Sequence, residues 1–201
     1  MSHGPGAGFK NPVFDSQRLF RQAMMALATP GQICEMAMDA EPPAPFMAAM
    51  AGLALCLVDF ETPLWLDAAF DRPEVLQYLR FHTGARFAPK PDAAAFALIG
   101  HALAMPNLSD FSLGTLENPH RSTDLFIQVE YLSNGEGPTL AGPGVAVPIE
   151  LRAGPLPRDF WAQRLAMQRH FPCGLDIYFV CGNRLAAVPR STRLMGDLPC
   201  M

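Results

Sequence analysis

The chain has 201 residues, half of them hydrophobic and 17% charged, with a formal net charge of −4. A chain of this length and hydrophobicity can bury a core of its own, which excludes intrinsic disorder and a disulfide-stapled miniprotein. The acidic balance gives no basic field for nucleic acid or for an anionic membrane, so neither is expected as a partner.

The cysteines and the apolar segments predict a cellular location. The sequence contains no C-x-x-C pair, so buried reduced thiols are expected rather than a disulfide framework or a zinc site. The N-terminus lacks the apolar stretch of a signal peptide. The longest apolar run, residues 45–58, is too short to span a bilayer. We therefore expect a cytoplasmic protein.

The beginning of the chain predicts a tail followed by a helix. Residues 1–10 are rich in glycine and are expected to form a flexible tail, and residues 11–201 a single α/β domain. The first helix is expected to begin at Asp15, a residue type that often caps helices, and to end before Pro30-Gly31. Its apolar residues at helical spacing predict one buried face, formed by Phe20, Met24 and Leu27.

Strands and helices then alternate along the chain. Strands are expected at residues 32–38, 64–66 and 95–99, and a buried helix at residues 46–58. A further helix is expected to open near Pro73 and to stop at Gly84. Residues 101–120 show little periodicity and are expected to be mostly loop.

The second half reads as strands with one helix. Strands are expected at residues 124–132, 139–141, 145–151, 175–181 and 185–188, and a helix opening at Pro157. Asn134-Gly135 predicts one hairpin connection and Gly182-Asn183 another. Because strands and helices are intermingled, the predicted fold class is α/β with a mixed sheet flanked by helices.

Common catalytic and metal motifs are missing from the sequence. None of the five histidines stands in a zinc-ligand spacing, and no G-x-S-x-G nucleophile elbow occurs. Clustered cysteines that could hold an iron–sulfur centre are also missing. We therefore expect no metal, no cofactor and no catalytic residue in this chain.

The segment from Pro189 to Arg193 is the strongest candidate for binding an anion. It places two guanidinium groups and two hydroxyl groups within four residues, and arginine favours bidentate capture of phosphate or phosphonate. In an extended chain Arg190 and Thr192 would share one face. The alternative is a segment that forms an interface or a salt bridge to a carboxylate.

A second candidate is Gly142-Pro143-Gly144. The two glycines would allow the backbone to come close to a ligand. Neither a Walker-type nor a dinucleotide-binding glycine motif is present, however, and Pro143 removes one N–H that an anion would use. A rigid bend between two strands is the alternative interpretation.

Together these patterns resemble one family over residues 11–194. In the first part of the chain the resemblance rests on Asn11-Pro12-Val13-Phe14-Asp15 and Thr29-Pro30-Gly31. In the middle it rests on Arg121-Ser122-Thr123 and Gly142-Pro143-Gly144. The last third contributes Phe160-Trp161, Phe171-Pro172 and Pro189-Arg190-Ser191-Thr192-Arg193. The sequence resembles the H subunit of carbon–phosphorus lyase, the PhnH family.

The resemblance implies a fold similar to pyridoxal-phosphate-dependent transferases but without their active site. It also implies a homodimer that joins subunits G, I and J in a core complex. With G, I and L, such a subunit is needed to transfer the ribose triphosphate of ATP to an alkylphosphonate with release of adenine. Radical cleavage of the carbon–phosphorus bond would belong to subunit J.

The lysines agree with a missing pyridoxal cofactor. A pyridoxal enzyme needs a desolvated lysine on a firm element for its Schiff base. Lys10 lies in the expected tail and Lys90 between two prolines in an expected loop. A residual pyridoxal-phosphate binder that uses Lys90 remains a third option.

Two hypotheses follow for the function. In the first, the chain is an interaction subunit with a mainly structural role in the complex. In the second, it is a free-standing enzyme or binding protein for a phosphate-bearing metabolite, which uses the Arg190–Arg193 segment. The candidate residues for binding or for an interface are Arg121, Gly142, Gly144, Arg190, Thr192 and Arg193.

Overall fold

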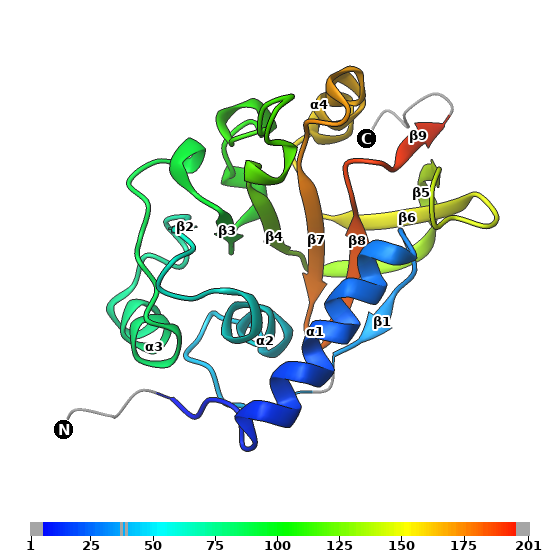
Figure 1. The fold of residues 1–201 in the computed structure, drawn as a ribbon. Coiled ribbons are helices and arrows are strands. Elements are labelled where there is room, and N and C mark those ends of the chain that lie inside the picture. Colours follow the sequence, from blue (N-terminus) through cyan, green and yellow to red (C-terminus); the bar gives the residue numbers. More distant parts are fainter. Residues whose placement is uncertain (1–5, 37, 39, 196–201) are drawn as a thin grey trace.

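The computed structural model describes residues 6–36, 38 and 40–195, and Figure 1 shows their arrangement. A six-stranded sheet forms the centre, in the order β1-β8-β7-β4-β3-β2. Its strands are β1 (Cys34–Glu35), β2 (Leu64–Leu66), β3 (Phe96–Ile99), β4 (Asp124–Gln128), β7 (Asp176–Cys181) and β8 (Arg184–Val188). β2, β3, β4 and β7 run parallel, whereas β8 is antiparallel to both β7 and β1.

A second, three-stranded sheet lies beside the first, in the order β6-β5-β9. It consists of β5 (Tyr131–Ala141), β6 (Ile149–Gly154) and β9 (Arg193–Met195), and the β5–β6 hairpin projects at the right of Figure 1. All its pairings are antiparallel. The predicted α/β class with a mixed sheet flanked by helices is therefore confirmed.

Strict alternation along the central strands creates two separate cores. Side chains of successive strand residues point to opposite faces of a sheet. Leu98, Phe126 and Tyr178 accordingly pack into one core. Their chain neighbours Ile99 and Ile127 pack into the other. The central sheet is thus buried on both faces, which explains why its strands are apolar runs.

Three helices cover the first face of the sheet. They are α1 (Pro12–Ala28), α2 (Ala48–Leu57) and α3 (Pro73–Thr83), and residues from all three belong to the first core. α3 begins at Pro73 and ends at Gly84, which adopts a left-handed φ of 69°, as the sequence predicts. Every described α2 residue from Ala49 to Ala54 is buried, in agreement with its apolar sequence.

The prediction for α1 is wrong at its start and on its buried face. The helix begins three residues before Asp15, because the Asn11 side chain caps it. The core side of α1 is formed by Leu19, Ala23 and Ala26. Phe20 and Met24 are instead 47% and 50% exposed, and only Leu27 among the predicted residues packs against the core. Small alanines let α1 lie close to α2, which leaves the bulky side chains outside.

The second face of the sheet is covered by the small sheet, by α4 (Phe160–Met167) and by a run of short 3₁₀ helices. α4 begins three residues after the predicted Pro157. Residues 101–120 are mostly loop, as predicted, with the short 3₁₀ helices η2 (Ala102–Ala104) and η3 (Leu108–Asp110), and η4 (Pro119–Arg121) closes the run. The other 3₁₀ helices are η1 (Pro91–Ala93) and η5 (Gln168–His170).

The predicted hairpin at Asn134-Gly135 is wrong. These residues lie inside β5, where a bulge shifts the register against β6 between Asn134 and Thr139. The Asn134 side-chain amide donates to the carbonyl oxygens of Gly31 and Glu150 at 2.9 and 3.1 Å, which fixes the bulge. The connection between β5 and β6 instead comprises residues 142–148. The hairpin predicted at Gly182-Asn183 does join β7 to β8.

The described part of the tail lies against α3. The Gly6 carbonyl oxygen is 2.9 Å from Nε2 of His82, and the Ala7 carbonyl oxygen accepts from the Glu41 N–H at 3.3 Å. The flexibility of residues 1–10 stays a prediction. Across residues 6–36, 38 and 40–195, no helix is both long and apolar enough to cross a membrane. The cysteines within these ranges are unpaired.

Candidate functional site

The Arg190 loop, residues Pro189–Arg193, connects β8 to β9. The Thr192 N–H donates to the Pro189 carbonyl oxygen at 2.9 Å, so the segment is a tight turn rather than the extended chain considered from the sequence. The turn brings Arg190, Ser191 and Thr192 to one end of the central sheet.

Arg190 is the centre of a hydrogen-bond network. Its Nη2 donates to Oδ2 of Asp176 at 2.6 Å and to Oγ of Ser122 at 2.7 Å. Its Nη1 donates to the Pro119 carbonyl oxygen at 2.5 Å, and its backbone N–H to Oδ1 of Asp176 at 2.7 Å. Burial acts to lower the pKa of Arg190, but the Asp176 carboxylate holds this pKa above its ordinary value. The guanidinium therefore ties the loop to β7 and η4.

A second carboxyl group lies beside this ion pair. Asp124 and Asp176 are register partners at the first positions of the neighbouring strands β4 and β7. Burial, and then the charge of Asp176, raises the pKa of Asp124 to about 7, against the opposing effect of Arg190. The raised pKa of Asp124 lies near neutral pH.

Arg164 of α4 supports the Arg190 loop from the inside. This arginine is 2% exposed, and its Nη2 donates to the carbonyl oxygens of Pro189 and Thr192 at 2.8 and 3.1 Å. Burial lowers the pKa of Arg164 to about 10, partly offset by Asp176. Two arginines thus fix the loop, one through its side-chain partners and one through its carbonyl groups.

The loop forms one wall of a pocket of about 340 Å³, here called the loop pocket. It is lined by Pro143, Gln168, Phe171, Arg190, Ser191, Thr192 and Arg193. Two buried polar atoms in this lining, Oγ1 of Thr192 and Nε2 of Gln168, have no hydrogen-bond partner. Thr192 itself is only 1% exposed. A buried polar group without a partner costs free energy, so an acceptor within hydrogen-bond distance of these two atoms would stabilise this part of the chain.

Comparisons with known proteins establish the family. The family described as "Bacterial phosphonate metabolism protein (PhnH)" matches residues 7–195. The chain belongs to the PhnH family. It is 36% identical over 189 residues to "Alpha-D-ribose 1-methylphosphonate 5-triphosphate synthase subunit PhnH" of Rhizobium meliloti (strain 1021), covering 92% of this chain and 93% of that protein. It is 30% identical over 184 residues to "Putative C-P lyase subunit protein HtxG" of Stutzerimonas stutzeri, covering 89% and 85%.

The segments that carried the resemblance to the PhnH family meet in space. Pro143, from the middle motif, lines the loop pocket together with the final motif. A side chain at Gly142 would lie 3.1 Å from the Ser191 carbonyl oxygen, so glycine there permits close contact with the loop. Gly144 instead faces the end of α1, where a side chain would collide with the Ala28 carbonyl oxygen.

Arg121 lies apart from the pocket. Its side chain is exposed at the end of η4, and its carbonyl oxygen accepts from Oγ of Ser112 at 3.0 Å. Sequence reasoning about the PhnH motifs also missed Arg164 and Gln168, which stand in α4 and η5 without any local signal. The role of Asp176 as the partner of Arg190 likewise follows only from the structure.

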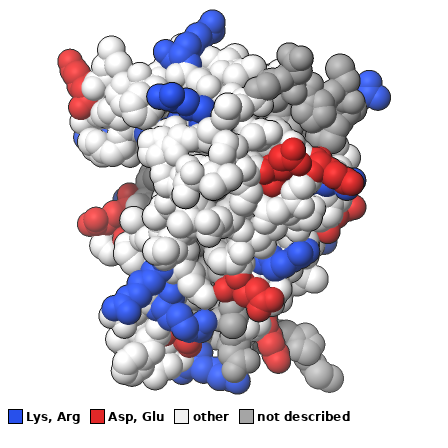
Figure 2. Space-filling model, turned by 90° about the vertical axis from the view of Figure 1, so that its right-hand side faces the viewer, with Lys and Arg blue, Asp and Glu red and all other residues white. Residues whose placement is uncertain are grey.

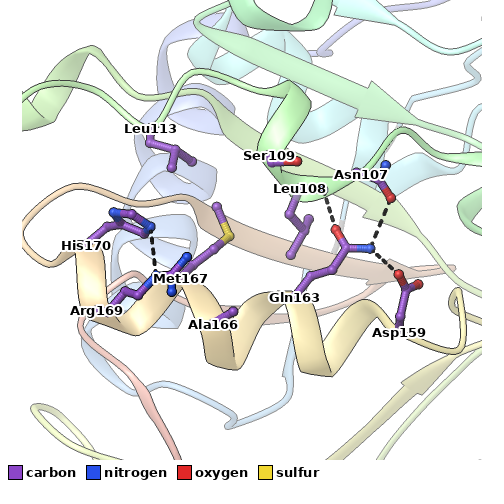
Figure 3. Close-up of a pocket in the computed structure, with 10 residues that line it drawn as sticks. All are labelled: Asn107, Leu108, Ser109, Leu113, Asp159, Gln163, Ala166, Met167, Arg169 and His170. Carbon is purple, nitrogen blue, oxygen red and sulfur yellow. Dashed lines mark hydrogen bonds between the residues drawn. The ribbon is translucent and has the colours of Figure 1, made fainter.

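A second pocket, of about 320 Å³, lies between η3 and α4 (Figure 3). At one end Gln163 donates to Asn107 and Asp159 and accepts from the Leu108 N–H. At the other end Arg169 donates to His170 at 3.3 Å. The floor is apolar, with Leu108, Leu113 and Met167 (Figure 3). The Gln163 amide is already hydrogen-bonded to neighbouring residues, so it is not among the buried polar atoms without a partner. The loop pocket differs in this respect.

The described residues contain no metal-binding cluster. Within residues 6–36, 38 and 40–195, no three His, Cys, Asp or Glu side chains are grouped to hold a metal ion.

Proposed function

We propose that this chain is a subunit of a carbon–phosphorus lyase assembly in phosphonate catabolism. The observation that carries the proposal is the family match over residues 7–195, with relatives named as subunits of a ribose methylphosphonate triphosphate synthase and of a C–P lyase. The chain would act with subunits G, I and L in transferring the ribose triphosphate of ATP to an alkylphosphonate, with adenine as leaving group. Its own role is mainly structural.

The proposed partners are subunits G, I and J, and a second copy of the chain in a homodimer. The structure supports a role that depends on subunit contacts through one apolar surface. Val13, Phe14, Phe20, Met24 and Met25 are between 47% and 75% exposed on α1. At 100° per residue they fall within one broad stripe, which we call the outer face of α1 and which also contains the exposed polar side chains of Gln17 and Arg21. Apolar side chains gathered in this way mark surfaces that proteins bury against partners.

A further uncharged area lies on the side of the molecule that carries the β5–β6 hairpin. In Figure 2 the left-centre of this side is largely uncharged, whereas acidic and basic side chains reach into its right-centre and lower middle. Interfaces between subunits are typically depleted of charge at their centre and polar at their rim. The distribution of charge thus agrees with a protein that works in an assembly.

We further propose the fold of pyridoxal-phosphate-dependent transferases without their cofactor. The mixed sheet with helices on one face and a small sheet on the other supports a common α/β layout. Lys90 is exposed between Pro89 and Pro91, next to η1. Lys10 is exposed just ahead of α1. Neither position supplies the desolvated amine that a Schiff base needs.

Co-expression tests the assembly directly. The full chain, tagged and produced with subunits G, I and J, is expected to purify as a stoichiometric complex. Recovery of the tagged chain alone, from cells in which G, I and J assemble with one another, would refute the proposal. A cytoplasmic location is part of the proposal and predicts that the complex is found in the cytosolic fraction.

The alternative of a free-standing phosphate-binding enzyme is favoured by one observation, the partnerless polar atoms of the loop pocket. Turnover of a phosphonate by the isolated chain would support it over the subunit role. Binding without turnover is compatible with both roles.

A further inference from the structure

We propose that the loop pocket binds the tetrahedral phosphoryl or phosphonyl group of a small metabolite, with Thr192, Gln168 and Arg193 as its ligands. The inference deepens the proposed function, because it gives the subunit a place for the phosphonate or phosphate that the assembly processes. The chemistry of the pocket itself is independent of any partner subunit.

The polar atoms available in the pocket suit an acceptor. Nε2 of Gln168 is a donor and the Thr192 hydroxyl can donate, and both are buried without a partner. Ser191 adds a second hydroxyl to the lining. A phosphoryl or phosphonyl group offers three acceptor oxygens and no obligatory donor, so it can satisfy these atoms at once.

The charge in the pocket is positive. Arg193 lines it and is exposed, and within the described residues its guanidinium forms no ion pair or hydrogen bond. Arg190 also lines the pocket, but Asp176 neutralises it through a contact of 2.6 Å. No Asp or Glu stands among the lining residues. Arg193 therefore supplies the net charge that attracts a dianion.

Hydrogen bonds within the chain hold the loop from two sides. On the inner side, Arg164 donates to carbonyl oxygens of the loop. The Arg190 guanidinium, which belongs to the loop, donates to Asp176, Ser122 and the Pro119 carbonyl oxygen. Arg190 thus acts as a positioning residue, which holds Thr192 and Arg193 in place. A site whose donors are fixed in advance loses less conformational entropy on binding.

The pocket has room for more than an inorganic ion. Its volume of about 340 Å³ falls in the range of small-molecule sites. Phe171 and Pro143 form apolar walls beside the donors. An organic substituent on the phosphorus, such as a methyl group or a ribose, would lie against these two side chains.

Titration calorimetry on the full chain tests the site. Methylphosphonate and ribose 5-phosphate serve as separate ligands, at low salt, with sodium chloride at matched ionic strength as the reference. Saturable binding of either ligand is expected, and the comparison between them tells a phosphonate from a phosphate ester. The proposal is overturned if neither ligand binds. It is also overturned if chloride at equal ionic strength displaces both ligands.

Two variants locate the binding. Arg193→Gln is expected to weaken it by about tenfold or more, the usual effect of losing a charged hydrogen bond. Thr192→Val is expected to weaken it by about two- to tenfold without lowering the melting temperature, because its hydroxyl has no partner in the protein. Arg86→Gln is the matched control, an exposed arginine next to β2 at the far edge of the central sheet. Equal affinity in wild type, Arg193→Gln and Thr192→Val overturns the proposal.

This experiment separates the site from the assembly. A chain that enters the complex with G, I and J but binds neither ligand refutes the site alone. A chain that binds ligand through Arg193 and Thr192 but never enters the complex refutes the assembly alone.

Discussion

The Asp176 carboxylate accepts both the backbone N–H and the guanidinium N–H groups of Arg190, and so joins the start of β7 to the loop after β8. The two side chains are only 17% and 18% exposed. Removing one member of such a pair leaves the other charge buried without compensation. The pair thus couples the stability of the central sheet to the shape of the loop pocket.

Arg190→Ala is expected to lower the free energy of unfolding by on the order of 3 kcal/mol, because Asp176 would lose its counter-charge. Urea denaturation of the purified chain measures this change. Arg152→Ala is the control, since its ion pair with Glu136 is far more exposed, and it should cost less than about 1 kcal/mol. Equal losses of unfolding free energy in the two variants would show that the Asp176–Arg190 pair stabilises the chain no more than an exposed ion pair does.

Asp124→Asn should change the pH dependence of stability. The pKa of Asp124 lies at about 7 in the folded chain against an ordinary value of 3.8, so the folded state holds its proton more tightly. Wild-type stability therefore falls as pH rises from about 4 to about 7, and the loss is complete above that range. The variant lacks this loss and should become relatively more stable across the same window, by on the order of 2–4 kcal/mol.

Thermal or urea unfolding of both proteins at a series of pH values checks the Asp124 prediction. A stability difference between wild type and Asp124→Asn that is constant from pH 4 to pH 8 would contradict it. The expected curve bends near the folded pKa of about 7.

Gly144→Ala should destabilise the fold more than Gly135→Ala. Both glycines have a positive φ, 80° and 87°, so both substitutions introduce backbone strain of about 1 kcal/mol. A side chain at 144 would in addition collide with the Ala28 carbonyl oxygen, whereas nothing lies within 4 Å of one at 135. We expect Gly144→Ala to cost roughly 2 kcal/mol more, measured by urea denaturation. Similar costs would mean that the β5–β6 connection does not contact the end of α1.

Charge on the outer face of α1 should block assembly without unfolding the chain. Phe20→Glu and Met24→Glu replace side chains that are 47% and 50% exposed, so the melting temperature should change little. Buried in an interface, the same carboxylates would be desolvated and unpaired, and recovery of the complex with G, I and J should fall by tenfold or more, about 1.4 kcal/mol or above.

Leu116→Glu is the matched control for the outer face, because Leu116 is apolar and 78% exposed but lies between η3 and η4, outside both α1 and the β5–β6 hairpin. This variant should assemble as wild type does. Gel filtration of the isolated variants reports separately on a homodimer. Full recovery of the complex with both α1 variants would exclude this face as the contact with another subunit.

Local signals in the sequence were sufficient for several elements. Pro73 and Gly84 bound α3 because proline fits the first helical turn and glycine the left-handed cap. Gly182-Asn183 makes the β7–β8 hairpin for similar reasons of backbone conformation. The apolar runs predicted central strands because a sheet covered on both faces needs them. In these places the relevant energy comes from residues close in the chain.

Tertiary contacts overruled local signals elsewhere. Asn134-Gly135 favours a hairpin turn, but the Asn134 amide binds carbonyl groups of Gly31 and Glu150, and β5 continues through a bulge. Helical spacing offered two apolar stripes on α1, and close packing against α2 selected the one with small alanines. Periodicity alone does not distinguish a stripe that faces the core from one that faces a partner.

The sequence by itself determined the family, the α/β class and the arginine-rich segment, because these depend on residue order and on the chemistry of single side chains. Only the tertiary structure decided what each arginine does. Arg190 meets Asp176 across 14 positions and Arg164 meets Pro189 across 25, and such partners are set by sheet order and helix packing. The same packing leaves Thr192 and Gln168 buried without partners, and no local pattern records this.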